Sequence, residues 1–169
     1  MQWPNLSWRT QVGLVAACYG AVLAFSAVVV TGRYLLERRN PNDFNGGMGA
    51  FGDWMLELFL FGLLLIPTFL LAFISREREK TSTALSKFLF AFSLLAPLSL
   101  GLALIPAIGQ KNTVLGDLCG LRLFAAPVTV VGLIGCRLLA RFRLAKRLLS
   151  WAVAIESATI VMMVAGFVF

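Results

Sequence analysis

Long apolar runs separated by short polar or charged stretches form the main pattern along the chain. A helix needs about 20 consecutive apolar residues to cross a bilayer, and several runs reach that length. The apolar–polar alternation that membrane-spanning strands require is absent. The pattern therefore predicts an all-α integral membrane protein, a single domain over residues 1–169 that forms a bundle of about five transmembrane helices. The expected spans are residues 11–32, 51–75, 88–109, 114–140 and 148–169.

The fourth expected span is less regular than the others. Arg122 and Arg137 are too close in sequence for the apolar residues between them to cross a bilayer alone. A full crossing over residues 114–140 requires these long side chains to reach the headgroups. The alternative is a re-entrant or interfacial segment, which would leave four spans, and Pro127 within the segment keeps that alternative open.

Small residues recur at every fourth position along the first expected span. One row contains Gly13, Ala17 and Ala21, and a neighbouring row contains Ala16, Gly20 and Ala24. Such rows allow helix backbones to approach closely in lipid, so we expect this helix to pack against other helices.

Composition supports the membrane class and removes several kinds of chemistry. Hydrophobic residues make up 59% of the chain and charged residues 14%, against about 25% charged in soluble domains. The chain has no histidine, which removes a common ligand of zinc and haem. Cys18, Cys119 and Cys136 are far apart and are interpreted as small apolar helix residues. We therefore expect no metal and no cofactor.

The net charge of +7 is distributed over the ends of the apolar runs, so we expect no nucleic-acid partner. One side of the expected bundle carries ten basic residues: Arg9, Arg76, Arg78, Lys80, Lys87, Arg137, Arg141, Arg143, Lys146 and Arg147. The other side carries five: Arg33, Arg38, Arg39, Lys111 and Arg122. Because cytoplasmic loops are enriched in Lys and Arg, this predicts a multi-pass inner (plasma) membrane protein with a cytoplasmic N-terminus and an external C-terminus.

Carboxylates within the expected spans are the main candidate functional residues. Asp53 and Glu57 are four residues apart, which places them one turn apart on the same helix face. Arg122 enters the bundle from the same side, so we expect it to pair with Glu57 or Asp53. Glu156 enters from the other side, where Arg137 is the expected partner.

These charges have two interpretations. A charge within a membrane commonly marks a binding site or ion path, which makes Asp53, Glu57, Arg122 and Glu156 the candidates for binding a ligand or ion. The same groups could instead form static ion pairs. Both interpretations stay open for Glu57 and Glu156. The structural one is preferred for Asp53 and Asp117, and Arg137 is a structural ion-pair candidate.

Motifs that identify an enzyme class are absent from the sequence. No nucleophile–histidine pair, phosphate-binding glycine loop or metalloprotease motif occurs. The favoured hypothesis is an accessory or scaffold subunit of a larger membrane complex, with the lipid bilayer and other membrane subunits or further copies of itself as partners. The alternatives are a small transporter or ion- or proton-conducting carrier that uses the intramembrane carboxylates, and a lipid-modifying membrane enzyme.

Overall fold

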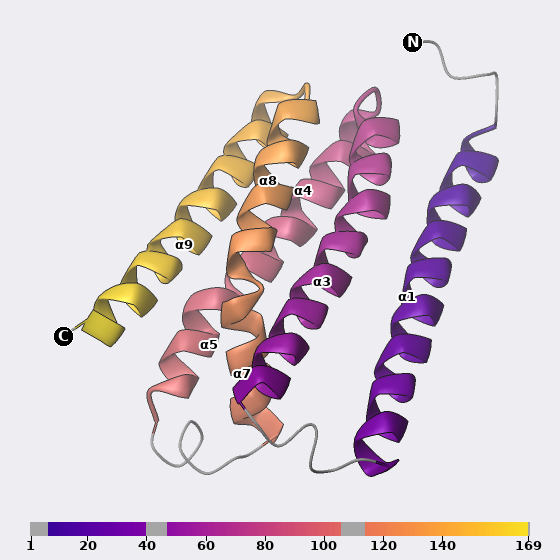
Figure 1. The fold of residues 1–169 in the computed structure, drawn as a ribbon. Coiled ribbons are helices and arrows are strands. Elements are labelled where there is room, and N and C mark those ends of the chain that lie inside the picture. The colour runs from indigo at the N-terminus through magenta and orange to yellow at the C-terminus, as the bar shows by residue number, and fades with distance from the viewer. Residues whose placement is uncertain (1–6, 40–46, 106–113, 169) are drawn as a thin grey trace. The chain divides into compact units, whose positions relative to one another are not determined.

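The computed structural model describes residues 7–39, 47–105 and 114–168, and this part of the chain is helical without any strand (Figure 1). In the described residues, four helical stretches are long and apolar enough to cross a membrane, or five if one bent pair counts as a single span. The four are Trp8–Arg39, Met55–Ser75, Glu79–Ala103 and Arg143–Ala165. The all-α prediction is confirmed for these residues. Their length and composition are compatible with a multi-pass membrane protein.

The helices extend beyond the apolar runs from which they were predicted. They are α1 (Trp8–Arg39), α3 (Gly47–Ser75), α4 (Glu79–Ser93), α5 (Leu95–Ala103), α7 (Val114–Phe124), α8 (Ala126–Leu139) and α9 (Arg143–Val168). Helices α4 and α9 begin at the charged residues Glu79 and Arg143, ahead of their apolar runs, because Glu, Lys and Arg are good helix formers.

The chain divides into two compact units, Met1–Leu71 and Ala72–Phe169. In the first unit, α1 and α3 are joined by two polar contacts. The Tyr19 hydroxyl is 2.8 Å from Thr68 Oγ1, and Arg33 Nε donates to Asp53 Oδ1 at 2.6 Å. The Arg33–Asp53 contact is near the end of α1 but near the start of α3, so the two helices run antiparallel.

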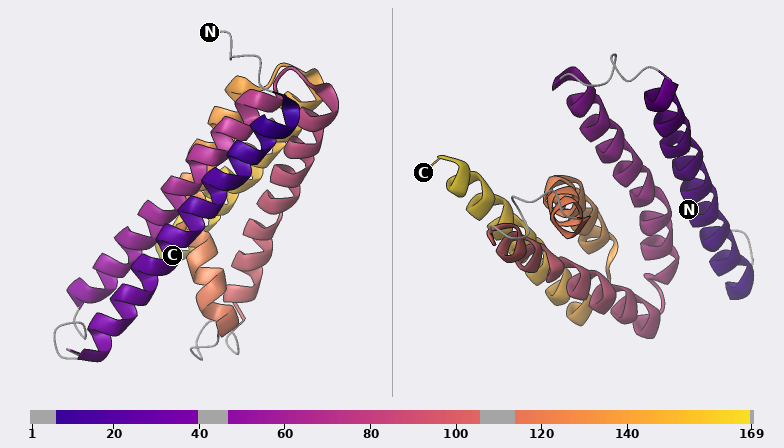
Figure 2. Two further views of the ribbon diagram at one scale, coloured as in Figure 1. Left: turned by 90° about the vertical axis from the view of Figure 1, so that its right-hand side faces the viewer. Right: turned by 90° about the horizontal axis from the view of Figure 1, so that it is seen from below.

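Helix α9 is central to the second unit, where it packs against α4, α5 and α8 (Figure 2). Its buried residues alternate in steps of four and three and include small side chains. They are Ala145, Leu149, Ala152, Glu156 and Thr159. This spacing matches the 3.5-residue period of closely packed helices, and small side chains at such positions let backbones approach.

The helices that face α9 also contribute small residues. The buried ones include Ser82, Ser86 and Ser93 on α4, Ala96 and Ser99 on α5, and Cys136 and Ala140 near the end of α8. Ser75 and Ser82 line a residual cavity of about 10 Å³, which is close to the space that one water molecule needs. The three cysteines are free thiols, and two of them are buried in this unit.

Two helix breaks lie just before prolines. Helix α4 gives way to α5 at Leu94, ahead of Pro97, and α7 gives way to α8 at Ala125, ahead of Pro127. The second pair of helices is bent by 52°. A proline within a helix lacks an N–H and its ring clashes with the carbonyl four residues earlier, which accounts for both breaks. The fourth expected span is therefore a bent helix pair.

Helix α3 continues through Pro67. The next residue supplies a local hydrogen bond, since Thr68 Oγ1 donates to the carbonyl oxygen of Leu64 at 2.7 Å. Hydroxyl side chains near a proline commonly satisfy backbone groups in apolar surroundings.

We predict that Ala152→Leu destabilises the second unit by about 1–3 kcal/mol, because Ala152 is fully buried and a larger side chain there separates packed helices. Ala154→Leu on the same helix is the matched control, since Ala154 is exposed and its change should stay within ~0.5 kcal/mol. Unfolding in mild detergent, followed by circular dichroism, measures the difference. Equal effects of the two substitutions would show that α9 does not pack through this face.

Candidate functional site

The deepest charges of the second unit belong to Arg122 and Glu156, which form an ion pair. Arg122 lies in the last turn of α7, just before the break at Ala125, and Glu156 lies well within α9. The side chain of Glu156 is 0% exposed and that of Arg122 is 10% exposed. The pair therefore joins two helices from positions that solvent barely reaches.

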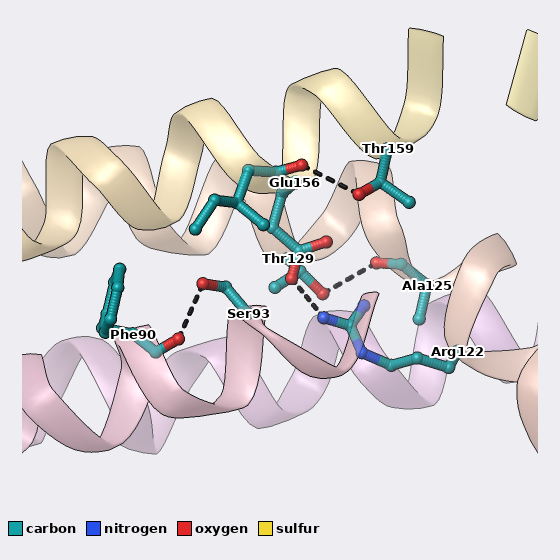
Figure 3. A network of polar contacts seen from close by, with 8 residues as sticks. Phe90, Ser93, Arg122, Ala125, Thr129, Glu156 and Thr159 are labelled. Atoms are coloured by element: carbon teal, nitrogen blue, oxygen red, sulfur yellow. Dashed lines mark hydrogen bonds and ion pairs between the residues drawn. The ribbon is translucent and has the colours of Figure 1, made fainter. Parts of the chain in front are cut away.

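Aromatic and hydroxyl side chains surround this pair. The Arg122 guanidinium carbon lies 4.7 Å from the centre of the Phe92 ring, close enough for a cation–π interaction. Figure 3 shows Arg122 and Glu156 directed toward each other, with Thr129 beside them and Ser93 nearby on α4. The site thus draws on residues from α4, α7, α8 and α9.

The hydroxyl groups near the pair use their protons within their own helices. Ser93 Oγ donates to the Phe90 carbonyl oxygen at 2.8 Å, and Thr129 Oγ1 donates to the Ala125 carbonyl oxygen at 3.0 Å. Thr159 Oγ1 likewise donates within α9, at 2.9 Å. These hydroxyl groups therefore donate to backbone carbonyls and not to Glu156.

Part of the pair's hydrogen-bonding capacity is unused. Within the described part of the chain, Arg122 Nε and Nη1 and Glu156 Oε2 are buried without a hydrogen-bond partner. Two donors of Arg122 and one acceptor of Glu156 therefore remain, groups of the kind that a water molecule or a small polar ligand satisfies. No group of three or more Cys, Asp or Glu side chains gathers as a possible metal site among the residues that the structure describes.

The predicted pairing of Glu156 with Arg137 is wrong, because Glu156 pairs with Arg122. Arg137 lies in the last turn of α8 and is exposed. Glu156 lies about 20 Å along α9 from Arg143, at ~1.5 Å per residue. Arg137 lies next to the turn that joins α8 and α9, so it is too far along the bundle to contact Glu156.

Arg122, expected to pair with Glu57 or Asp53, has this different partner within its own unit. Asp53 pairs with Arg33 from α1, and both side chains are partly exposed. Glu57 lies one turn further along α3 with an exposed side chain. The side chain of Asp117, on α7, lies outside the described part of the chain. The structure thus brings together Arg122 and Glu156 among the candidate residues.

The sequence contains a signal for the helix face on which Glu156 lies, and the predicted pairing with Arg137 did not use it. Ala145, Leu149 and Ala152 precede it in steps of four and three, which predicts that Glu156 continues a packing face. Phe92 carries no comparable signal, because its contact with Arg122 depends on where α4 lies against the break between α7 and α8.

We predict that Glu156→Gln lowers the free energy of unfolding by about 3–5 kcal/mol, because it leaves the buried guanidinium of Arg122 without a counter-charge. Arg122→Met combined with Glu156→Met should recover a large part of the loss, since no buried charge remains. Arg137→Gln is the control, and its effect should stay within ~0.5 kcal/mol because Arg137 is exposed. Unfolding followed by circular dichroism in mild detergent measures all three variants. If Glu156→Gln lowered the free energy of unfolding no more than Arg137→Gln does, the ion pair would contribute little to stability.

Comparisons with models of protein families, with curated proteins and with solved structures found no match. What the Arg122–Glu156 pair does must follow from its own contacts, its burial and the physical chemistry of charges in an apolar interior.

Proposed function

We propose that the chain is a small multi-pass protein of the bacterial inner membrane that acts as an accessory or scaffold subunit of a larger membrane complex. The observation that carries this proposal is the internal neutralisation of the deepest charges. Arg122 and Glu156 pair with each other, which joins α7 to α9. A charge pair that is used to join helices favours a fixed bundle over one that exchanges ions.

Helix α1 supports the scaffold role. The two rows of small residues along it are exposed, and a Cβ atom added at Gly13 or Gly20 meets nothing within 4 Å. Turning at about 100° per residue, the helix places Gly13 and Gly20 on a side away from Tyr19 and Arg33, which contact α3. A helix of a partner subunit or of a further copy can approach closely over such a surface.

The proposed orientation has a cytoplasmic N-terminus and an external C-terminus with five crossings. Arg122 forms a buried ion pair, so it is not counted among the basic residues of the loops. The remaining basic residues divide ten to four between the two sides, which strengthens the bias. Five crossings require α7 and α8 to act as one bent span.

A second candidate function is a small carrier or conducting protein. It is favoured by the three buried atoms of the ion pair that lack partners, and by their position at the α7–α8 break. Broken helices in transporters commonly bind ions or substrates at such points. On this hypothesis the pair would open to take a proton or a small ion.

Purification of the tagged chain in mild detergent tests the scaffold proposal. We expect a stoichiometric membrane partner, or a stable homo-oligomer, that is lost on Gly20→Leu because the larger side chain blocks close helix approach. Gly32→Leu is the matched control, since Gly32 also has open space around it but lies outside the small-residue rows. The partner should survive in the control.

Flux through proteoliposomes separates the two candidate functions. A scaffold subunit gives no flux of protons or small ions, with or without Glu156. A monomeric chain whose flux falls sharply on Glu57→Gln or Glu156→Gln would overturn the scaffold proposal and support the carrier.

Reporter fusions after Phe169 test the orientation. With five crossings the C-terminal reporter should be active only outside the cytoplasm, and one fused ahead of Trp8 only inside it. A C-terminal reporter that is active in the cytoplasm would mean four crossings, with α7 and α8 re-entering on one side.

A further inference from the structure

An open groove of about 580 Å³ lies on the second unit, beside the first two turns of α9. The described residues that line it are Arg143, Leu144, Lys146, Arg147 and Ser150. Three of these five are cations and none is a carboxylate. The volume falls within the roughly 300–1,000 Å³ of small-molecule sites.

The groove and the helix packing use different faces of α9. Arg143, Arg147 and Ser150 follow one another in steps of four and three, so they share one side of the helix. The packed residues Ala145 and Leu149 lie on another side and are buried. The cations are therefore left free to bind something outside the bundle.

The three cations have no protein counter-charge in the described part of the chain. The ion pairs found there use Arg33, Arg76 and Arg122. Cations in the first turns of a helix also oppose the helix dipole, which is unfavourable. An anion bound among them removes both the mutual repulsion and this cost.

Ser150 does not provide a further donor to the groove. Its hydroxyl donates to the Lys146 carbonyl oxygen at 2.7 Å. Recognition of an anion therefore depends on the two guanidinium groups and the ammonium group. Guanidinium groups hold phosphate oxygens in pairs, whereas an ammonium group acts as a point charge.

Apolar side chains place this groove at the edge of an apolar layer. Trp151, one turn beyond Arg147, is 65% exposed, and Leu144 is 51% exposed. Tryptophan is enriched at the level of lipid headgroups, and α9 continues from there as a helix apolar enough to span a membrane. Basic residues just cytoplasmic of such a helix attract anionic lipids.

We propose that the groove formed by Arg143, Lys146 and Arg147 binds the headgroup phosphate of an anionic phospholipid, with the lipid chains lying along Leu144 and Trp151. This inference depends on the membrane location and orientation proposed above and is independent of the scaffold role. A soluble phosphate compound has the same anionic chemistry, but it would not use the exposed apolar residues beside the cations.

Quenching by brominated lipids tests the proposal in the full-length chain. The protein is reconstituted into phosphatidylcholine vesicles that contain a small fraction of brominated lipid, either phosphatidylglycerol or phosphatidylcholine. The fluorescence lost on Trp151→Phe isolates the signal of Trp151. We expect brominated phosphatidylglycerol to quench that signal far more strongly than brominated phosphatidylcholine at the same fraction. Equal quenching overturns the proposal.

Charge variants locate the binding. Replacing Arg143, Lys146 and Arg147 together by Gln should lower the preference for phosphatidylglycerol about 100-fold, from ~1 kcal/mol for each basic residue near the surface. The control replaces Arg9, Lys80 and Lys87 by Gln, which removes the same charge elsewhere and should leave most of the preference. If the control variant lost as much of the preference for phosphatidylglycerol as the groove variant, net charge alone would explain the effect. That result would overturn the proposal.

Two further measurements keep the result decisive. Arg143→Gln and Arg147→Gln, each made alone, should each lower the preference for phosphatidylglycerol about fivefold, which locates the binding if the triple variant fails to fold. Inorganic phosphate added in excess should leave the quenching by phosphatidylglycerol intact. Its displacement by free phosphate would identify a soluble anion as the ligand and overturn the lipid assignment. Loss of the membrane partner in the scaffold test leaves all these outcomes unchanged.

Discussion

The cost of removing charge from water is the constraint on which the second unit depends. Burying a guanidinium and a carboxylate costs several kcal/mol for each ion, and their attraction offsets this only when they meet in good geometry. Arg122 and Glu156 meet across α7 and α9, and the cation also contacts the Phe92 ring. The positions of three helices are therefore tied to one pair. A shift of α7 along α9 by a single turn would separate the charges.

Prolines and small residues make that meeting possible. The break at Ala125 allows α7 to leave the direction of α8 by 52°, so that Arg122 approaches α9 at the depth of Glu156. The break at Leu94 lies beside Ser93, which is fully buried near the pair. Elsewhere on α9, Ala145 and Ala152 keep the neighbouring helices close. The two helix breaks thus lie close to the charges, on the helices that face the regular packing surface of α9.

The sequence predicts the helical class because apolar runs of membrane length leave few other structures. It predicts helix starts less well, since helices begin at charged residues such as Glu79 and Arg143, ahead of the apolar runs that follow them. The pairing of Arg122 with Glu156 could not be obtained from the side on which each residue enters the bundle, because it depends on how α7 and α9 lie after the break at Ala125. The contact of Arg33 with Asp53 could have been predicted from the sequence. Two antiparallel helices that follow one another along the chain bring the end of the first beside the start of the second.

Depth separates two uses of charge on one helix. Glu156 is fully buried and pairs with Arg122 within the protein. Arg143 and Arg147 lie at the exposed start of α9, where no protein carboxylate in the described chain neutralises them. From Arg147 to Glu156 the helix rises about 13 Å at ~1.5 Å per residue. Substitutions that far apart without shared partners act additively. The stability of the bundle and the affinity of the groove are therefore separable properties of α9, and a change at one end reports on that end alone.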